Sequence, residues 1–364
     1  MYNIVVSAGG TGGHIIPALN VSKELIKRGI SVCFIGNKDS MEESIITKNN
    51  IVFYAINVQK IYRSFTIKHI FFPYKFLNSF MKCKKYLAAI KPKAFIGFGG
   101  FVSGAPALAA NSLGIPVYLQ EQNVRPGITN VITGRLARTA FLAYPESCKY
   151  FKKCKIILSG NPINKRQATN LNEESVRMKE TSSGQSQGNR KLFILGGSQG
   201  SLFINELIIN NLDLFNINKI DLIWQTGVSH ISNINLKLAD LKQNLSINIT
   251  TFDFIDHIND IYNSVDYVIA RGGAMSLSEI ESFRLPVFII PIESRFKNEQ
   301  YYNAKNMVQK NYGFMFQQKE KKDFKTKFKA FIENADGMYT SSEQSLHLSA
   351  RTTIVDAIFK DFNI

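Results

Sequence analysis

Residues 7–29 read SAGGTGGHIIPALNVSKELIKRG and place four glycines around a threonine, just ahead of a histidine and a proline. They follow an apolar run at residues 4–7 that is typical of a buried strand. A glycine loop between a strand and a helix leaves amide N–H groups free to approach an anion, which the helix dipole also favours. Pro17 suits the first turn of the helix, and Gly29 suits its end. The stretch therefore predicts a strand, loop and helix that bind phosphate.

The same pattern repeats along the chain. Strand-like runs occur at residues 4–7, 31–35, 51–56, 94–96, 117–119, 140–143 and 156–158, then at 191–195, 222–224, 247–252, 267–270 and 287–290. Amphipathic stretches such as 18–28 and 76–90 lie between them. Strands that alternate with helices predict an α/β fold with doubly wound parallel sheets.

A polar stretch at residues 164–190 interrupts the pattern, which then restarts. We expect two Rossmann-like parallel-sheet lobes facing a cleft, at residues 1–162 and 163–345, with a polar insertion at about 165–190. Residues 346–364 are expected to form a C-terminal helix that could pack back on the first lobe. One large sheet with a long loop is the alternative, but such loops are rare in compact domains.

Three further glycine loops follow strands, at residues 97–104, 196–201 and 271–276. Two loops in each half suggest a cleft that handles more than one diphosphate. The spacing of the dinucleotide fingerprint fails and no Walker lysine follows, which argues against NAD and ATP enzymes. No Asp-x-Asp triplet is present to hold a metal-bridged nucleotide. We therefore expect no metal and no cofactor, and charge compensation from amides, helix ends and basic side chains.

Composition adds two constraints. The 364 residues are 45% hydrophobic and carry a formal net charge of +16, which favours an anionic partner such as nucleic acid, acidic lipid or a phosphorylated substrate. No signal peptide, no membrane-spanning stretch and no paired or zinc-spaced cysteines are evident, so a cytosolic, reducing location is expected.

Several motifs occur in the order seen in one enzyme family. They are GGTGGH (9–14), GFGGFVSGAP (97–106), EQN (121–123), GNP (160–162), GGSQGS (196–201), FID (254–256) and RGGAMSLSEI (271–280). From residue 2 to about 313 the chain resembles the MurG family, peptidoglycan N-acetylglucosaminyltransferases with the GT-B fold.

The resemblance implies an inverting transfer of GlcNAc from UDP-GlcNAc to the C4 hydroxyl of the muramyl residue of lipid I. The product is lipid II, made at the cytoplasmic face of the inner membrane without a metal. The resemblance also implies which residues contact the donor. Together with the glycine loops, it predicts these donor-binding residues: Thr11, Gly12, Gly13, Asn123, Asn164, Ser198, Ile255, Ala274, Met275, Ser276, Leu277, Ser278, Glu279 and Gln300. The acceptor diphosphate is expected at Gly9, Gly10, Gly99, Gly100, Ser103 and Gly104.

The catalytic base stays open between two residues. His14 stands at a helix start, where the dipole should lower its pKa and keep it able to accept a proton. Alternatively, His14 only positions phosphate, and Glu121 is then the next candidate base.

Glu279 also has two interpretations. Ser276-x-x-Glu279 matches a capping box, which would use both side chains structurally. The resemblance instead makes Glu279 a partner of the ribose hydroxyls. Two departures from the family pattern stand out: Asn164 replaces a common arginine, which Lys165 or Arg166 could substitute, and Glu299 replaces a usual glutamine.

Residues 61–91 interleave apolar and aromatic side chains with lysines. We expect a membrane face there, with Ile70, Phe71, Phe72, Lys75 and Lys82, that lies on anionic lipid without crossing it. The alternative is an ordinary core-facing helix with a solvated lysine side. Nucleic acid is not expected as a partner, because no nucleic-acid motif accompanies the charge.

Two other functions remain possible from sequence. A UDP-GlcNAc 2-epimerase would share fold and donor but leave the loops of the first lobe unexplained. A non-catalytic nucleotide-sugar or membrane scaffold would best tolerate the changes at Asn164 and Glu299.

Overall fold

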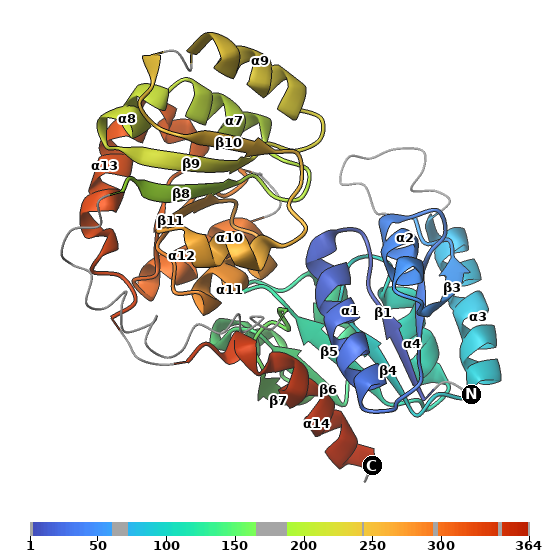
Figure 1. Cartoon of the computed structure of the whole chain (residues 1–364). Coiled ribbons are helices and arrows are strands. Elements are labelled where there is room, and N and C mark those ends of the chain that lie inside the picture. Colours follow the sequence, from blue (N-terminus) through green and yellow to red (C-terminus); the bar gives the residue numbers. More distant parts are fainter. Residues whose placement is uncertain are drawn as a thin grey trace. The chain divides into compact units, whose positions relative to one another are not determined.

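The computed structural model describes residues 3–59, 72–164, 188–241, 244–293, 298–340 and 344–362. The chain divides into two α/β units (Figure 1). Unit 1 comprises Met1–Asn164 and Gln344–Ile364, and unit 2 comprises Lys165–Glu343. The polar stretch predicted as an insertion lies outside the described residues between 165 and 187.

Unit 1 contains a seven-stranded parallel sheet in the order β3-β2-β1-β4-β5-β6-β7. Its strands are β1 Ile4–Ser7, β2 Val32–Asn37, β3 Val52–Ile56, β4 Ala94–Gly97, β5 Val117–Glu121, β6 Thr139–Leu142 and β7 Lys155–Leu158. Its α-helices are α1 Gly12–Lys27, α2 Met41–Lys48, α3 Phe72–Ile90, α4 Gly104–Ser112, α5 Ile128–Thr133 and α14 Ala350–Phe362.

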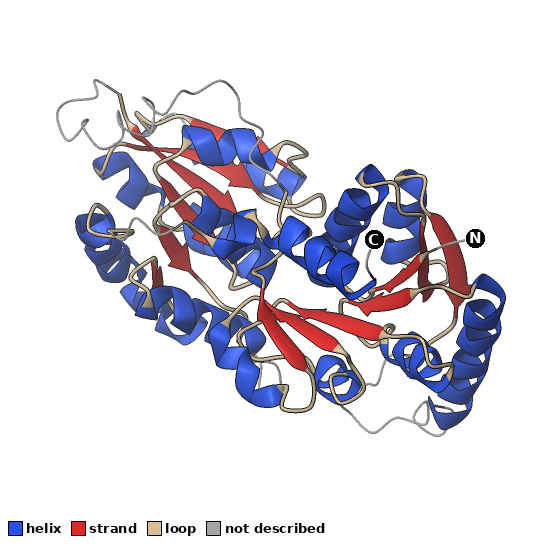
Figure 2. Ribbon diagram, turned by 90° about the horizontal axis from the view of Figure 1, so that it is seen from below, coloured by secondary structure: helices blue, strands red, loops and turns tan. Residues whose placement is uncertain are grey.

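Helices cover both faces of this sheet (Figure 2). Val6 of β1 packs in one core with residues of α1 and α14, and its neighbour Val5 packs in another core with residues of α3 and α4. Successive strand side chains point to opposite faces, so a strand that is buried on both sides needs a continuous apolar run. The sequence of β1 supplies that run.

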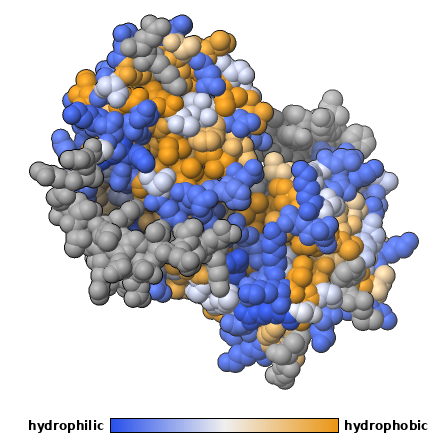
Figure 3. Space-filling view, viewed as in Figure 1, coloured by the Kyte–Doolittle hydropathy of each residue, from blue (hydrophilic) through white to orange (hydrophobic). Residues whose placement is uncertain are grey.

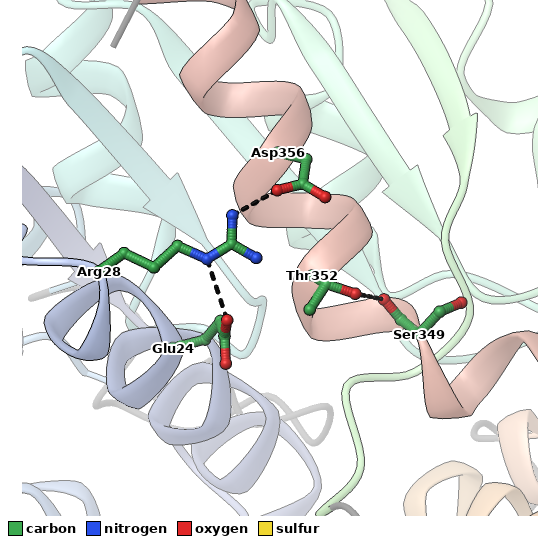
Figure 4. A network of polar contacts seen from close by, with 5 residues as sticks. All are labelled: Glu24, Arg28, Ser349, Thr352 and Asp356. Atoms are coloured by element: carbon green, nitrogen blue, oxygen red, sulfur yellow. Dashed lines mark hydrogen bonds and ion pairs between the residues drawn. The ribbon is translucent and has the colours of Figure 1, made fainter.

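The C-terminal helix α14 belongs to unit 1. Ile354, Val355 and Ile358 are buried in the same core as α1. Figure 4 shows Arg28 at the end of α1 donating to Glu24, 3.0 Å away, and to Asp356 of α14. The bond to Asp356 also raises the pKa of Arg28.

Unit 2 contains a six-stranded parallel sheet in the order β10-β9-β8-β11-β12-β13. Its strands are β8 Arg190–Leu195, β9 Ile220–Gln225, β10 Ile249–Phe252, β11 Tyr267–Ala270, β12 Val287–Ile289 and β13 Gly313–Met315. Its α-helices are α7 Leu202–Ile209, α8 Leu212–Ile217, α9 Ile231–Leu241, α10 Ile258–Ser264, α11 Ala274–Ser282, α12 Glu299–Gln309 and α13 Phe324–Ala335.

The predicted fold class, two Rossmann-like parallel-sheet lobes, is confirmed. One local expectation is wrong: α1 begins at Gly12, so Pro17 lies inside the helix and not in its first turn. A proline at this place removes the helical bond to the carbonyl four residues earlier, and its ring crowds that carbonyl. Gly29 follows the helix with a φ of +81°, as predicted for its end.

Among the described residues, the structure contains no helix with both the length and the apolar character that crossing a bilayer requires.

Candidate functional site

Two glycine loops meet at the carboxyl edge of the first sheet. Residues 8–11 lead from β1 into α1, and residues 98–103 lead from β4 into α4. A Cβ at Gly100, whose φ is +76°, would lie 2.0 Å from the carbonyl oxygen of Gly9. Only glycine permits this approach and this backbone angle. The two loops therefore pack directly against each other.

The predicted loop residues differ in exposure. Gly10, Thr11 and Gly13 are exposed, and Gly12 and Gly100 are half-buried. The buried members are Gly9, Gly99, Ser103 and Gly104. The Ser103 hydroxyl donates to the Gly100 carbonyl at 3.2 Å, so it stabilises the loop itself. A ligand would therefore meet mainly the exposed start of α1.

His14 lies in the first turn of α1, three residues after the N-cap residue Thr11. Its Nδ1 is 3.1 Å from the Thr11 hydroxyl oxygen, within hydrogen-bond distance. A Cβ at Gly99 would lie 3.2 Å from His14 Cδ2. The half-buried imidazole is therefore held where the two glycine loops meet.

Glu121 at the end of β5 is buried, with 1% of its surface exposed. Its Oε1 accepts hydrogen bonds from Asn123 N at 2.9 Å and Asn123 Nδ2 at 3.0 Å. Its Oε2 accepts from Gly127 N at 3.2 Å and Asn130 Nδ2 at 2.9 Å. Burial raises the pKa of Glu121 despite these four donors. The carboxylate thus clamps the 122–127 loop to the start of α5.

The clamp reaches the glycine loops through Asn130. A Cβ at Gly99 would lie 3.0 Å from Asn130 Nδ2, and the His14 ring lies on the same glycine. Glu121, Asn130, Gly99 and His14 are therefore neighbours in unit 1. Asn164 is an exposed residue at the end of the first segment of unit 1, and Lys165 and Arg166 are outside the described residues.

In unit 2, the loop at residues 196–201 joins β8 to α7. A Cβ at Gly200 would lie 2.0 Å from the Thr226 carbonyl oxygen, and one at Gly227 would lie 2.3 Å from that of Gln199. Ser201 is the N-cap of α7, where its hydroxyl accepts from Ile204 N at 3.3 Å. Ser198 is exposed on this loop. The start of α7 is therefore a fixed group of amides with an exposed hydroxyl beside it.

Gln225 at the end of β9 ties this loop to the FID segment. Its Nε2 donates to the Gly197 carbonyl at 3.1 Å, and its Oε1 accepts from Ile255 N at 3.1 Å. The Ile255 amide is thus used within the protein, which leaves its carbonyl as the backbone group for a ligand.

Arg271 follows β11 and is a partly buried cation. Its guanidinium donates to the Ser201 hydroxyl, to the Ile290 carbonyl at 3.1 Å and to Gln318 Oε1 at 3.2 Å. Because all three acceptors are neutral, its charge is not compensated by them. Burial lowers the pKa of Arg271 to about 10. The result is a positive charge held beside the N-cap of α7.

Glu279 lies in the second turn of α11, whose N-cap is Gly273. The capping-box interpretation is therefore wrong, because neither Ser276 nor Glu279 is placed to cap the helix. Burial raises the pKa of Glu279 from 4.5 to about 7. No described residue donates a hydrogen bond to its carboxylate. A partly buried carboxylate without a donor is suited to accept hydrogen bonds from a ligand.

The remaining donor candidates of unit 2 lie around the same helix. Ala274, Met275, Leu277 and Ser278 are buried, and Ser276 is half-buried. Gln300 is the second residue of α12, where its Oε1 accepts from Ile292 N at 3.0 Å. Its carbonyl would lie 2.4 Å from a Cβ at Gly272, so α12 packs on the glycine loop before α11.

The described residues include no group of three or more His, Cys, Asp or Glu side chains arranged to hold a metal ion.

Comparison with known proteins places these features in a family. Residues 4–142 match the glycosyltransferase family 28 N-terminal domain, and residues 191–357 match the family 28 C-terminal domain. The UDP-N-acetylglucosamine--N-acetylmuramyl-(pentapeptide) pyrophosphoryl-undecaprenol N-acetylglucosamine transferase of Flavobacterium psychrophilum is 32% identical over 99% of this chain and 97% of its own length. The chain belongs to the MurG family of glycosyltransferases.

Solved structures agree with this assignment. The crystal structure of Acinetobacter baumannii MurG is 25% identical and matches with a TM-score of 0.77 over 99% of this chain and 100% of its own. A UDP-GlcNAc 2-epimerase from Neisseria meningitidis, bound to UDP-GlcNAc, is 17% identical with a TM-score of 0.67 over 98% and 100%. The second likeness shows the fold alone. The resemblance to the MurG family seen in the motifs is confirmed.

Sequence reasoning missed Gln225 and Arg271 as candidate site residues. Arg271 was visible as a basic residue directly before a Gly-Gly pair at a strand end, the position where a diphosphate site needs charge. Gln225 gave no such signal, because its role depends on which loops lie on either side of it.

Proposed function

We propose that this chain transfers GlcNAc from UDP-GlcNAc to the C4 hydroxyl of the muramyl residue of lipid I, with inversion at the anomeric carbon. The product is lipid II, so the enzyme is a hexosyltransferase of peptidoglycan and cell wall synthesis that serves cell shape and division. The match to a transferase named for this chemistry, over almost the whole of both chains, carries the proposal. The unpaired carboxylate of Glu279 supports it from the structure.

Unit 2 binds the donor. The amides at the start of α7, the Ser198 hydroxyl and the Arg271 guanidinium receive the diphosphate, since a helix N-terminus and a nearby cation both favour negative charge. The Ile255 carbonyl contacts uracil, Glu279 accepts hydrogen bonds from the ribose hydroxyls, and Gln300 meets the sugar. These groups can also stabilise the charge on the departing UDP.

Unit 1 binds the acceptor at its paired glycine loops. His14 is the base that takes the proton from the acceptor hydroxyl, because it lies where the loops meet and Thr11 orients its ring. Glu121 is a positioning residue, because its two oxygens already accept four hydrogen bonds. It holds Asn123 and Asn130 in place around the loops.

An assay of UDP release separates this function from the alternatives. The transferase releases UDP only when a lipid-linked muramyl acceptor is present. An epimerase would convert the donor sugar without an acceptor, and a scaffold would do neither. Release that is equally fast with and without the acceptor would reject the proposal.

The membrane face lies on α3, which is apolar on two sides. Cys83 and Leu87 are buried in the core, with Phe76 and Phe80 packed against it. Tyr74, Leu77 and Met81 are instead 70%, 59% and 55% exposed. At 100° per residue these three fall within about 60° of one another on the helix. The helix thus has a core side and a separate exposed apolar stripe.

Exposed lysines lie along one side of this stripe. Lys75, Lys82 and Lys85 are exposed, and the helix contains no acidic residue. Hydrophobic residues are visible among hydrophilic ones on the surface of unit 1 in Figure 3. Apolar side chains that insert at the headgroup boundary, with lysines that meet anionic lipid, suit a peripheral membrane surface. Ile70, Phe71 and the side chain of Phe72, predicted for the same face, lie outside the described residues.

Vesicle cosedimentation tests this face. Binding should rise with the anionic lipid fraction, fall in high salt, and fall roughly tenfold in the Leu77→Ser/Met81→Ser variant. Ile217→Ser is the matched control, since Ile217 is 74% exposed at the end of α8. Equal binding to neutral and anionic vesicles, or an equal loss in the control, would contradict the membrane face.

A further inference from the structure

Tyr262 of α10 carries a buried hydroxyl that has no hydrogen-bond partner among the described residues. The side chain is completely buried. Its ring packs edge-on against Phe193, with centroids 5.7 Å apart, and at a tilt against Phe283, with centroids 5.2 Å apart. Buried hydroxyls are normally paired, so an orphan held this firmly calls for an explanation.

Glu279 of α11 is the charged residue that influences this hydroxyl. Tyr262 shares one core with Leu277, Ile280 and Phe283 of α11. Residues four apart lie on the same helix face, so Glu279 is one turn before Phe283 on the side that meets Tyr262. The Glu279 charge further raises the pKa of Tyr262, after the larger effect of burial. A buried hydroxyl without a partner on α10 and a carboxylate without a donor on α11 therefore belong to helices that share one core.

Two basic residues near α11 that the structure describes are already engaged. Lys310 of α12 lies 3.6 Å from Glu281, and Arg271 at the end of β11 donates to Ser201, Ile290 and Gln318. Burial alone accounts for the raised pKa of Glu279. Within the part of the chain that the structure describes, the Tyr262 hydroxyl is a donor still without an acceptor.

We propose that Tyr262 is a positioning residue that donates its hydroxyl hydrogen bond to the Glu279 carboxylate when the nucleotide is bound. The inference rests on the proposed role of Glu279 in ribose recognition. Tyr262 takes one lone pair of the ionised carboxylate and fixes its rotamer, and the remaining lone pairs accept the ribose hydroxyls. The aromatic contacts keep the tyrosine hydroxyl at one place, so the carboxylate is held for the sugar instead of being free to rotate.

A double-mutant cycle with UDP as the probe tests the proposal. Calorimetry measures UDP affinity for the full-length protein and for Tyr262→Phe, Glu279→Gln and the double variant. We expect Tyr262→Phe to weaken UDP binding about five- to twentyfold and Glu279→Gln about ten- to hundredfold. The double variant should bind no more weakly than Glu279→Gln alone, because the hydroxyl acts through the carboxylate.

Two further measurements separate positioning from packing. The melting temperature of ligand-free Tyr262→Phe should not fall, because the variant removes a hydroxyl that has no partner. Its UDP affinity should depend less on pH than that of the wild type, because the bound carboxylate loses a donor that favours ionisation. Tyr267→Phe is the control: Tyr267 is buried on β11 against Phe331, and its variant should keep wild-type affinity.

Results other than those expected would each reject a different part of the proposal. Unchanged affinity in Tyr262→Phe overturns the inference but leaves the ribose site intact. If Tyr262→Phe lowers UDP affinity as much in the Glu279→Gln background as in the wild type, the inference is overturned in favour of direct contact between Tyr262 and the nucleotide. Loss of affinity together with a lower melting temperature and an unaltered pH profile assigns Tyr262 a packing role only. Wild-type affinity in Glu279→Gln would instead reject the proposed ribose site.

Discussion

Replacing Glu279 by glutamine should make the ligand-free protein more stable while it weakens UDP binding. Glutamine keeps the shape of the side chain but removes the ionisable group. Burial raises the pKa of Glu279 from 4.5 to about 7, and no described residue donates to it, so the ionised form is disfavoured in the folded state. A carboxylate that binds ribose hydroxyls should be unfavourably ionised in the ligand-free protein, because its hydrogen-bond donors come from the ligand.

The size of the effect follows from the two pKa values. The folded protein holds the proton up to about pH 7, whereas the unfolded chain releases it near 4.5. Above pH 7 the difference destabilises the fold by at most about 3 kcal/mol. Screening by solvent at a partly exposed group reduces the expected gain from Glu279→Gln to about 1–2 kcal/mol. The penalty shrinks as pH falls from 7 to 4.5, because in that range the folded protein binds a proton that the unfolded chain does not, and below 4.5 both are protonated.

Thermal unfolding at two pH values measures the stability difference between Glu279→Gln and the wild type. At pH 8 the variant should melt about 2–6 °C above the wild type. At pH 5 the two curves should nearly coincide. A variant that is less stable than the wild type at pH 8, or a gain that is the same at both pH values, would refute the reasoning that Glu279 is an unpaired, desolvated carboxylate.

Three further predictions concern the loops and charges. His14→Ala should lower turnover about a hundredfold with little change in donor affinity, and near-normal turnover would remove His14 from the chemistry. Gly100→Ala should destabilise unit 1 by about 2–4 kcal/mol in denaturant unfolding, since its Cβ would overlap the Gly9 carbonyl; a shift within error would contradict the contact. Arg271→Gln should weaken UDP binding about tenfold and uridine binding much less, because only UDP carries the diphosphate; equal losses for both would place Arg271 elsewhere.

Much of the fold could be predicted because its signals are local. Apolar runs such as residues 4–7 and 267–270 end in glycine loops, and both are strands in the structure. Strand β13, Gly313–Met315, was missed, since its sequence GFM begins with glycine and contains no β-branched residue. The start of α1 was also misjudged, because the glycines at 12 and 13 read as loop although they form the first helical turn.

The sequence also predicted some features of the candidate site and not others. Motif spacing drew attention to His14, Glu121 and Glu279 as individual residues. Sequence could not reveal that Glu121 accepts four hydrogen bonds or that Glu279 has no donor, since both depend on where neighbouring loops lie. The capping-box pattern at 276–279 failed because the helix already begins at Ala274, after a Gly273 N-cap. For α3, the core-facing alternative is seen on one side of the helix, whereas the membrane face on the exposed side stays a prediction.

The structure of the product is the measurement that bears most closely on the proposed reaction. Incubated with UDP-GlcNAc and a lipid-linked muramyl acceptor, the protein should form a disaccharide whose GlcNAc is β-linked to the C4 oxygen of the muramyl residue. NMR of the isolated product reports both the linkage and the anomeric configuration. An α-linked sugar, attachment at another hydroxyl, or recovery of only an epimerised nucleotide sugar would contradict the inverting transfer to lipid I.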